Sequence, residues 1–280
     1  MSYLKFVFEA PDDVHEFLIA ELLDLDFYGF EQEENRLIAY VEKRRFNDMN
    51  REWIEQMMLT IPGGSVQEMD EIAETNWNET WEQTIRPQHI GRFFVRPTWS
   101  LEEAPPGLQL LEIDPKMSFG TGYHATTRLM LNTLSRLDLD GRKLLDAGTG
   151  TGILAIAALL IGAENAVAFD VDPWSERNAT ENALINRVAK QIDIRLGGFE
   201  VLDDDEQFGV VLANINRNVI LEFLPQLVAF TEPGGTLCLT GLLQTDQEKV
   251  LDALESQPVS IASTATEEEW ILFHLIRQGS

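Results

Sequence analysis

Hydrophobic residues divide the chain into regions with different spacing. Up to about residue 72, apolar positions either alternate with polar ones or recur every three to four residues, which predicts short strands and helices. Predicted strands cover 4–8, 37–41 and 65–72, and predicted helices cover 14–25, closed near Gly29, and 46–59. This order predicts a small α+β domain of ferredoxin-like type over residues 1–72.

Residues 73–100 have a different composition and are predicted to connect two domains. Pro87 and Pro97 interrupt the segment, and only a short helix at 76–84 and a strand at 93–95 are expected. Its tryptophans are predicted either to pack between the domains or to form an aromatic surface that faces a substrate; they are Trp77, Trp81 and Trp99.

Residues 101–280 alternate strands and helices. A helix is predicted at 126–137, and from residue 143 nearly apolar strands alternate with helices, which indicates a parallel sheet covered on both faces. The strands are 143–147, 166–170, 192–196, 210–214, 236–240 and about 270–276; the helices are 153–160, 173–186, 218–230 and 247–254. The fold class is therefore α/β, with a Rossmann-like, doubly wound domain. Such sheets bind ligands beyond the carboxyl ends of their strands.

The charge of the chain narrows the range of partners. Lys and Arg number 21 and Asp and Glu number 47, so the net charge is −26. This charge disfavours direct nucleic-acid binding, which depends on neutralising phosphates. It is compatible either with attraction of a basic protein or with adaptation to high salt. There is no apolar run long enough for a bilayer span, no export signal and no zinc cluster around the single Cys238, so a cytoplasmic protein without a metal is expected. The oligomeric state does not follow from these features, and a monomer is the expectation.

A glycine-rich turn follows the strand at 143–147. Gly148, Gly150 and Gly152 stand where the backbone must bend sharply and admit a ligand. A dinucleotide-binding turn needs its third glycine at position 153, which is Ile153 here. The spacing therefore favours a nucleoside that lacks a diphosphate.

An acidic residue follows the next strand. Asp170 lies 22 residues after Gly148, where a carboxylate accepts hydrogen bonds from both ribose hydroxyls. Asp172 and Pro173 are predicted to be the N-cap and first residue of the following helix. The glycine turn, the acid and the capped helix together predict an adenosine-bearing cofactor.

Three segments resemble the ribosomal protein L11 methyltransferase family, whose members use S-adenosylmethionine. The resemblance runs from about Asp114 to the C-terminus, and Ala125 stands where the family usually has proline. The segments are Phe119-Gly120-Thr121-Gly122-Tyr123-His124-Ala125-Thr126-Thr127, Asp146-Ala147-Gly148-Thr149-Gly150-Thr151-Gly152-Ile153-Leu154-Ala155-Ile156-Ala157 and Leu212-Ala213-Asn214-Ile215.

The resemblance implies roles for both domains. The N-terminal domain would recognise a large-subunit ribosomal protein, and the connector would let the catalytic domain at 101–280 reach several amines in turn. It also implies cofactor contacts at Thr127, Gly148, Asp170 and Asn214. Gly150 in the turn joins this set, as do Gly120, Thr121 and Gly122, because their loop is placed to cover the amino-acid end of the cofactor.

Methyl transfer from a sulfonium to an amine requires a neutral nitrogen in line with the methyl group. Asn214, which ends a predicted strand, is expected either to accept hydrogen bonds from the amine or to orient the cofactor, with help from Asn216. His124 is expected to orient its loop, Trp174 to lie in the core, and Phe119 to flank the adenine or join the core. No essential general base is expected.

These features predict a methyltransferase that acts on lysine side chains, and on the N-terminal amine, of a ribosomal protein. The same catalytic domain could instead methylate another protein or a small molecule, or the chain could be a non-catalytic ribosome adaptor that binds the cofactor. Ile153 argues against an NAD-linked dehydrogenase. The run Asn214-Ile215-Asn216-Arg217 lacks the Asn-Pro-Pro-aromatic sequence of enzymes that methylate amides or bases.

Overall fold

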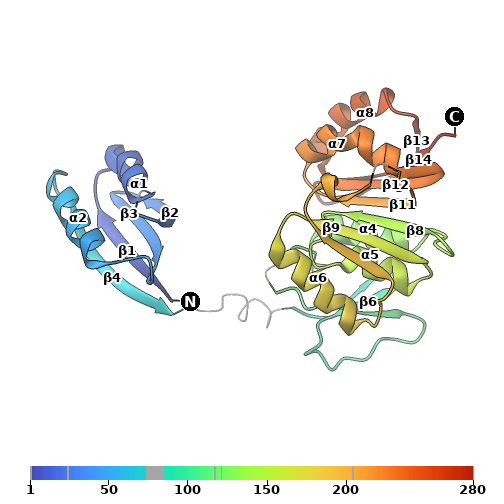
Figure 1. Ribbon diagram of the computed structural model, residues 1–280, viewed down its shortest axis with the longest axis horizontal. Coiled ribbons are helices and arrows are strands. Elements are labelled where there is room, and N and C mark those ends of the chain that lie inside the picture. The colour runs from blue at the N-terminus through green and yellow to red at the C-terminus, as the bar shows by residue number, and fades with distance from the viewer. Residues whose placement is uncertain are drawn as a thin grey trace. The chain divides into compact units, whose positions relative to one another are not determined.

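The computed structural model describes residues 2–23, 25–73, 85–116, 118–120, 122–203 and 205–279. The chain forms two compact units, Met1–Trp77 and Asn78–Ser280 (Figure 1). Within the described residues, no helix is both long and apolar enough to cross a membrane.

The first unit is a four-stranded antiparallel sheet with two helices on one face (Figure 1). Its strand order is β2-β3-β1-β4, the arrangement of a ferredoxin-like fold, as predicted. Alternate side chains of β1 and β3, such as Phe6 and Ala39, share one core with Leu18 and Ile54 of the two helices. The elements are β1 Ser2–Glu9, η1 Asp12–Val14, α1 His15–Leu23, β2 Phe27–Glu33, β3 Arg36–Glu42, α2 Asp48–Leu59 and β4 Ser65–Ala73.

Strand β2 was not predicted, because Gly29 was interpreted as the end of a helix. The helix ends earlier, at Leu23, and Asp26 adopts a positive φ of 66° before the chain enters β2. Gly29 instead lies within β2, where the pairing with β3 shifts register between Phe27 and Gly29. An isolated glycine inside a strand commonly marks such an irregularity.

A three-stranded sheet begins the described part of the second unit. It comprises β5 Gln88–Ile90, β6 Phe93–Arg96 and β7 Gln109–Glu112, in that order. The predicted strand at 93–95 is confirmed as β6, which begins with three apolar residues. Strands β5 and β7 are not predicted, because each is short and includes polar residues at an end. Part of the predicted connector is thus hydrogen-bonded into a sheet with β7. The predicted helix at 76–84, with Trp77 and Trp81, lies outside the described residues.

The main sheet of the second unit has seven strands in the order β10-β9-β8-β11-β12-β14-β13. Its elements are α4 Ala125–Leu134, β8 Lys143–Ala147, α5 Ile153–Leu160, β9 Asn165–Asp170, α6 Pro173–Ile185, β10 Ile192–Leu196, η2 Phe199–Val201, β11 Phe208–Asn214, α7 Arg217–Phe230, β12 Thr231–Leu243, η3 Gln244–Asp246, α8 Gln247–Glu255, β13 Val259–Glu267 and β14 Trp270–Arg277. Buried side chains of α4 and α5 pack in one core cluster, and those of α7 and α8 pack in another on the opposite face. The doubly wound α/β class is confirmed.

The sheet is not parallel throughout, which corrects the sequence-based expectation. Strands β8 to β12 pair in parallel, but β14 pairs antiparallel with both β12 and β13. Strand β13 was not predicted, because it carries mostly exposed Ser, Thr and Ala residues rather than an apolar run.

The strand order reverses at β8, which lies between β9 and β11. In a doubly wound sheet, a crevice forms at the carboxyl ends of the strands where the order reverses. The fold therefore places the ends of β8, β9 and β11 at the expected position of a ligand site.

Candidate active site

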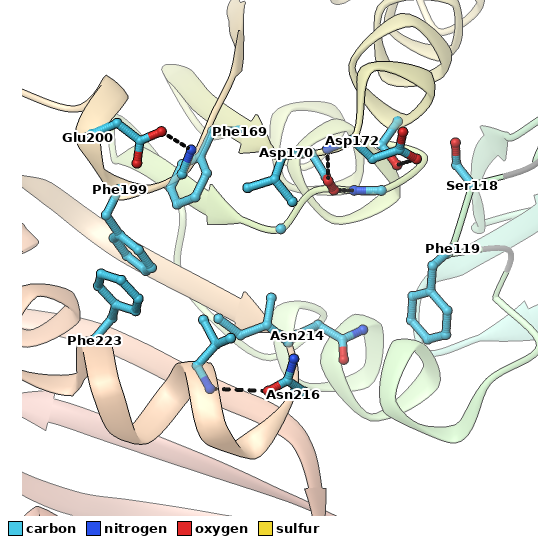
Figure 2. A pocket seen from close by; sticks show the side chains of 17 residues that line it. Ser118, Phe119, Phe169, Asp170, Asp172, Phe199, Glu200, Asn214, Asn216 and Phe223 are labelled. Atoms are coloured by element: carbon cyan, nitrogen blue, oxygen red, sulfur yellow. Dashed lines mark hydrogen bonds between the residues drawn. The ribbon is translucent and has the colours of Figure 1, made fainter. Parts of the chain in front are cut away.

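A cavity of about 710 Å³ opens at the carboxyl ends of β8, β9 and β11 (Figure 2). Its volume falls within the roughly 300–1,000 Å³ typical of small-molecule sites. Four predicted cofactor residues line it together: Gly148, Gly150, Asp170 and Asn214.

Each backbone N–H of the glycine turn donates a hydrogen bond to another group of the protein. The N–H groups of the first two residues of the turn, 148–152, both donate to the carbonyl oxygen of Phe169, at 3.0 Å each. The N–H of the third residue, Gly150, donates to a carboxylate oxygen of Asp170 at 2.9 Å. The N–H of the fourth residue donates to the carbonyl oxygen of Phe119 at 2.8 Å. The fifth donates to the carbonyl of Thr149 at 2.9 Å. No N–H of this turn is left to cradle a phosphate, which supports the argument against a diphosphate ligand.

Two glycines of the turn have no space for a side chain. Gly150 has a φ of +56°, and a Cβ atom there would lie 2.2 Å from the carbonyl oxygen of Phe119. Gly148 has a φ of +74°, and its Cβ would lie 2.3 Å from a methyl group of Ile215. Both positions require glycine for backbone conformation and for close approach.

Asp170 is fixed by hydrogen bonds on both carboxylate oxygens. One oxygen accepts from the N–H of Gly150 and the other from the N–H of Asp172, at 2.9 and 3.0 Å. Each carboxylate oxygen can accept a further hydrogen bond, so Asp170 can still bind hydroxyl groups in the cavity. Asp172 caps α6 through the N–H of Trp174 at 3.0 Å, and Pro173 is the first helical residue, as predicted.

One end of the cavity is aromatic, which the sequence did not predict. The rings of Phe199 and Phe223 are stacked, 4.4 Å apart and 13° from parallel, and Phe169 meets Phe199 edge-on at 5.1 Å (Figure 2). Phe199 follows the pair Gly197-Gly198 directly after β10. That pair at a strand end was the available signal for a second ligand-facing turn.

Acidic side chains near this end differ in their environment. The backbone N–H of Gly198 donates to Glu200 at 2.7 Å and holds the pKa of that carboxyl below its usual range. Beneath the glycine turn, burial raises the pKa of Asp146 to about 6, although Thr149 and Ala155 donate hydrogen bonds to it. Asp146 does not line the cavity and supports the turn from below.

Asn214 and Phe119 lie at the other end. Figure 2 shows the Asn214 amide pointing toward the Phe119 ring, and both residues line the cavity. The Asn214 amide makes no hydrogen bond with the described residues, so it is available to a ligand. Asn216, expected to assist, also lines the cavity, and its oxygen caps α7 by accepting from the N–H of Val219 at 3.1 Å.

Of the remaining predicted cofactor residues, the described ones do not line the cavity; they are Gly120, Gly122 and Thr127. Gly120 has a φ of +104° and its carbonyl accepts from the hydroxyl of Thr151 at 2.5 Å, and Gly122 has a φ of +86°. Thr127 is buried in the first turn of α4, and its hydroxyl has no partner among the described residues. Thr121 lies outside the described residues. Cofactor contacts at these four positions stay a prediction.

His124 contacts its own loop and caps the helix that follows, and a role in orienting the loop stays a prediction. Its Nδ1 accepts from the N–H of Thr126 and caps α4, while its ring packs against Phe119 at 5.1 Å and Trp270 at 4.7 Å. The prediction that Trp174 belongs to the core is wrong, because its side chain is 62% exposed. The guanidinium of Arg177 lies 4.3 Å from the ring centroid and accounts for its position on the surface.

Ser118 is a cavity residue that the sequence analysis missed. Its hydroxyl is buried in the cavity wall and has no hydrogen-bond partner among the described residues. Buried hydroxyls are rarely left unpaired, so this one is suited to a polar atom of a ligand. Its position one residue before Phe119 was the only sequence signal.

Comparisons with known proteins identify the family of this chain. Residues 16–278 match the family model for ribosomal protein L11 methyltransferase (PrmA). The chain is 36% identical to proteins of that name from Chlorobaculum tepidum, covering 96% of this chain and 95% of the relative, and from Porphyromonas gingivalis, covering 96% of each. A crystal structure of a ribosomal protein L11 methylase from Lactobacillus delbrueckii subsp. bulgaricus aligns with a TM-score of 0.62 and 27% identity, over 67% of this chain and 96% of that one. The chain therefore belongs to the ribosomal protein L11 methyltransferase family.

Proposed function

We propose that this protein transfers methyl groups from S-adenosylmethionine to amino groups of ribosomal protein L11, at lysine side chains and at the N-terminal amine. One observation carries the proposal: an Asn214 amide without a partner among the described residues faces a cavity whose glycine turn has no N–H left for phosphates. This combination suits a nucleoside with a reactive, uncharged or cationic end.

The cavity residues fit S-adenosylmethionine in chemical type. Asp170 would hold the ribose hydroxyls, and the aromatic end formed by Phe169, Phe199 and Phe223 would take the adenine. The methionine end would then lie toward Asn214 and the unpaired hydroxyl of Ser118. When bound, the cofactor supplies an electrophilic methyl group on a cationic sulfur.

The acceptor amine needs position and a free lone pair. A lysine amine has a solution pKa of about 10.4 and must lose a proton before it can attack. Entry into a partly apolar cavity favours the neutral amine, because burial disfavours the charged form. The oxygen of Asn214 then accepts an N–H of the amine and directs its lone pair into the cavity. Water can take the proton beforehand, so no side chain need act as a base.

A basic substrate protein fits the charge of the chain. The net charge of −26 attracts a positively charged partner over long range and speeds its association. The names of the relatives support ribosomal protein L11 as that partner. We assign its recognition to the N-terminal ferredoxin-like unit, and the presentation of successive amines to the segment between the units.

The test is methyl transfer to purified ribosomal protein L11 with S-adenosylmethionine labelled in its methyl group. The expected result is label on the protein, located by mass spectrometry at lysine and N-terminal amines. Label on other proteins of an extract but not on L11 would overturn the substrate assignment. Cofactor binding without transfer to any protein would indicate an adaptor, and nicotinamide binding would indicate a dehydrogenase.

A further inference from the structure

Phe119 contacts the protein through both its backbone and its ring, although the residue is 52% exposed. Its carbonyl oxygen accepts from the N–H of Thr151 at 2.8 Å, directly above Gly150, where no side chain fits. Its ring meets the ring of His124 edge-on at 5.1 Å, and His124 in turn packs against Trp270. An exposed aromatic ring with this support can act as a fixed wall of the cavity.

The Phe119 ring and the amide of Asn214 both line this end of the cavity (Figure 2). The carboxylates that line the cavity belong to Asp170, the last residue of β9, to Asp172 just after it, and to Glu200, which follows β10. The Phe119 ring is therefore the electron-rich group at the same end as Asn214. Aromatic faces attract methylated ammonium groups, whose positive charge is spread over their methyl groups.

The two groups suit different methylation states of one amine. A primary amine offers N–H groups that the oxygen of Asn214 can accept. A neutral dimethylamine has no N–H left and uses its lone pair for attack, and a trimethylammonium product has neither. As methylation proceeds, Asn214 therefore loses its hydrogen bonds to the amine, whereas the attraction between the Phe119 ring and the methylated nitrogen increases.

We propose that Phe119 determines how many methyl groups each amine receives, by holding the di- and trimethylated nitrogen that Asn214 cannot bind. The inference rests on the proposed methyltransferase function. In each transfer the nitrogen lone pair forms the new N–C bond as the C–S bond breaks, and the electron pair of that bond stays on sulfur as a neutral thioether. The positive charge moves to nitrogen, which releases a proton to water while it still carries one.

The experiment compares wild-type protein with Phe119→Leu, which removes the aromatic face, and Phe119→Tyr, which keeps it. Leu101→Ala, at a 91% exposed residue that does not line the cavity, is the matched control for loss of an exposed apolar side chain. Each protein is incubated with S-adenosylmethionine and purified ribosomal protein L11. Mass spectrometry follows the mono-, di- and trimethyl forms at each amine over time, and calorimetry measures the affinity for S-adenosylhomocysteine.

The expected result for Phe119→Leu is a first methylation within about threefold of wild type and a conversion of dimethyl to trimethyl slowed about tenfold, the size of a cation–π contact. Phe119→Tyr and Leu101→Ala are expected to give the wild-type distribution, and all variants to keep the affinity for S-adenosylhomocysteine.

Three results would overturn the inference. They are an unchanged methyl distribution in Phe119→Leu, an equal slowing of all three steps that tracks a loss of cofactor affinity, and a wild-type protein that stops at one methyl group per amine. The last result leaves the proposed function intact. A wild-type protein that transfers no methyl group to L11 removes the proposed function and this inference with it.

Discussion

The two ends of the cavity differ in whether their polar groups are already hydrogen-bonded within the protein. At the ends of β8 and β9, each N–H of the glycine turn is hydrogen-bonded within the protein, and Asp170 is fixed through both carboxylate oxygens, each of which can still accept from a ligand. At the end of β11, Asn214 has no partner among the described residues, although its neighbour Asn216 is committed to capping α7. The first region is rigid before any ligand arrives, and the second keeps a polar group free for one.

This difference separates binding from chemistry. The N–H groups of the glycine turn are already hydrogen-bonded, so the turn does not have to rearrange when a ligand binds. It selects the ligand by the shape of the cavity and by the fixed carboxylate of Asp170. The half-buried amide of Asn214 keeps its hydrogen-bonding groups free of partners among the described residues, and a hydrogen bond to the amine or cofactor is worth about 0.5–1.5 kcal/mol net of the water it replaces. Substitutions in the two regions should therefore affect different steps.

Gly150→Ala should have the largest effect and should act on binding. The added Cβ would meet the carbonyl of Phe119 at 2.2 Å in a backbone conformation with φ of +56°. Left-handed strain of about 1–2 kcal/mol and overpacking of about 1–3 kcal/mol sum to roughly 4 kcal/mol, or a thousandfold weaker binding of S-adenosylhomocysteine if the turn is displaced. Calorimetric titration measures the affinity, and thermal unfolding measures any loss of stability.

Gly141→Ala is the matched control for this substitution. Gly141 also has a positive φ, of 65°, but nothing lies within 4 Å of the position of its Cβ. Only the conformational cost of about 1–2 kcal/mol should appear, as lower stability with normal cofactor affinity. If the two variants lose affinity equally, close packing of Phe119 on the turn is not what shapes the site.

Asn214→Ala should have the next largest effect and should act on the chemical step. Loss of one preorganised polar group in an active site typically slows turnover about a hundredfold or more, roughly 3 kcal/mol. Steady-state methylation kinetics and cofactor titration together separate the two roles considered for this residue. A lower kcat with unchanged cofactor affinity assigns Asn214 to the amine, and a parallel loss of affinity assigns it to the cofactor.

Asn216→Ala is the control for Asn214. It removes the cap of α7 and should cost about 1 kcal/mol of stability with turnover near wild type. Normal turnover in Asn214→Ala, or equal losses in both variants, would contradict a special role for the end of β11.

The sequence predicted the rigid region better than the free one. Gly148, Gly150 and Asp170 were found because turn geometry and ribose recognition demand particular residue types at a fixed spacing. Asn214 was located by its position at a strand end and by resemblance. Nothing in the sequence showed that Asn216, two residues later, would be used as a helix cap, because both asparagines suit either role.

The aromatic end escaped prediction for a physical reason. Phe199 and Phe223 stack across 24 positions of sequence, one after β10 and the other on α7. Each taken alone has the periodicity of an ordinary core residue, so only the tertiary structure reveals the pair. The same limit hid the strands β2 and β13, where a glycine and a run of exposed Ser and Thr masked the pattern.

The smallest expected effect concerns the support beneath the rigid region. Asp146 is fully buried and burial raises its pKa to about 6, well above the value of 3.8 for a free aspartate. Between about pH 4 and pH 6 the folded protein therefore holds a proton that the unfolded chain releases, so this residue makes the fold less stable as pH rises through that window. The difference of about two pKa units corresponds to roughly 2–3 kcal/mol.

Asp146→Asn tests this because its amide carbonyl can still accept from Thr149 and Ala155 but never becomes charged. Urea unfolding from pH 4 to pH 8 measures the free energy of unfolding of both proteins. Relative to wild type, the variant should gain roughly 2 kcal/mol of stability as the pH rises through the window. A cost is subtracted from this gain at every pH, because the NH₂ group of the variant replaces a buried oxygen that has no partner among the described residues. The acidic groups shared by both proteins cancel in this difference. A constant difference between the two proteins at every pH would show that Asp146 stays charged in the folded state, and that the glycine turn rests on a buried carboxylate.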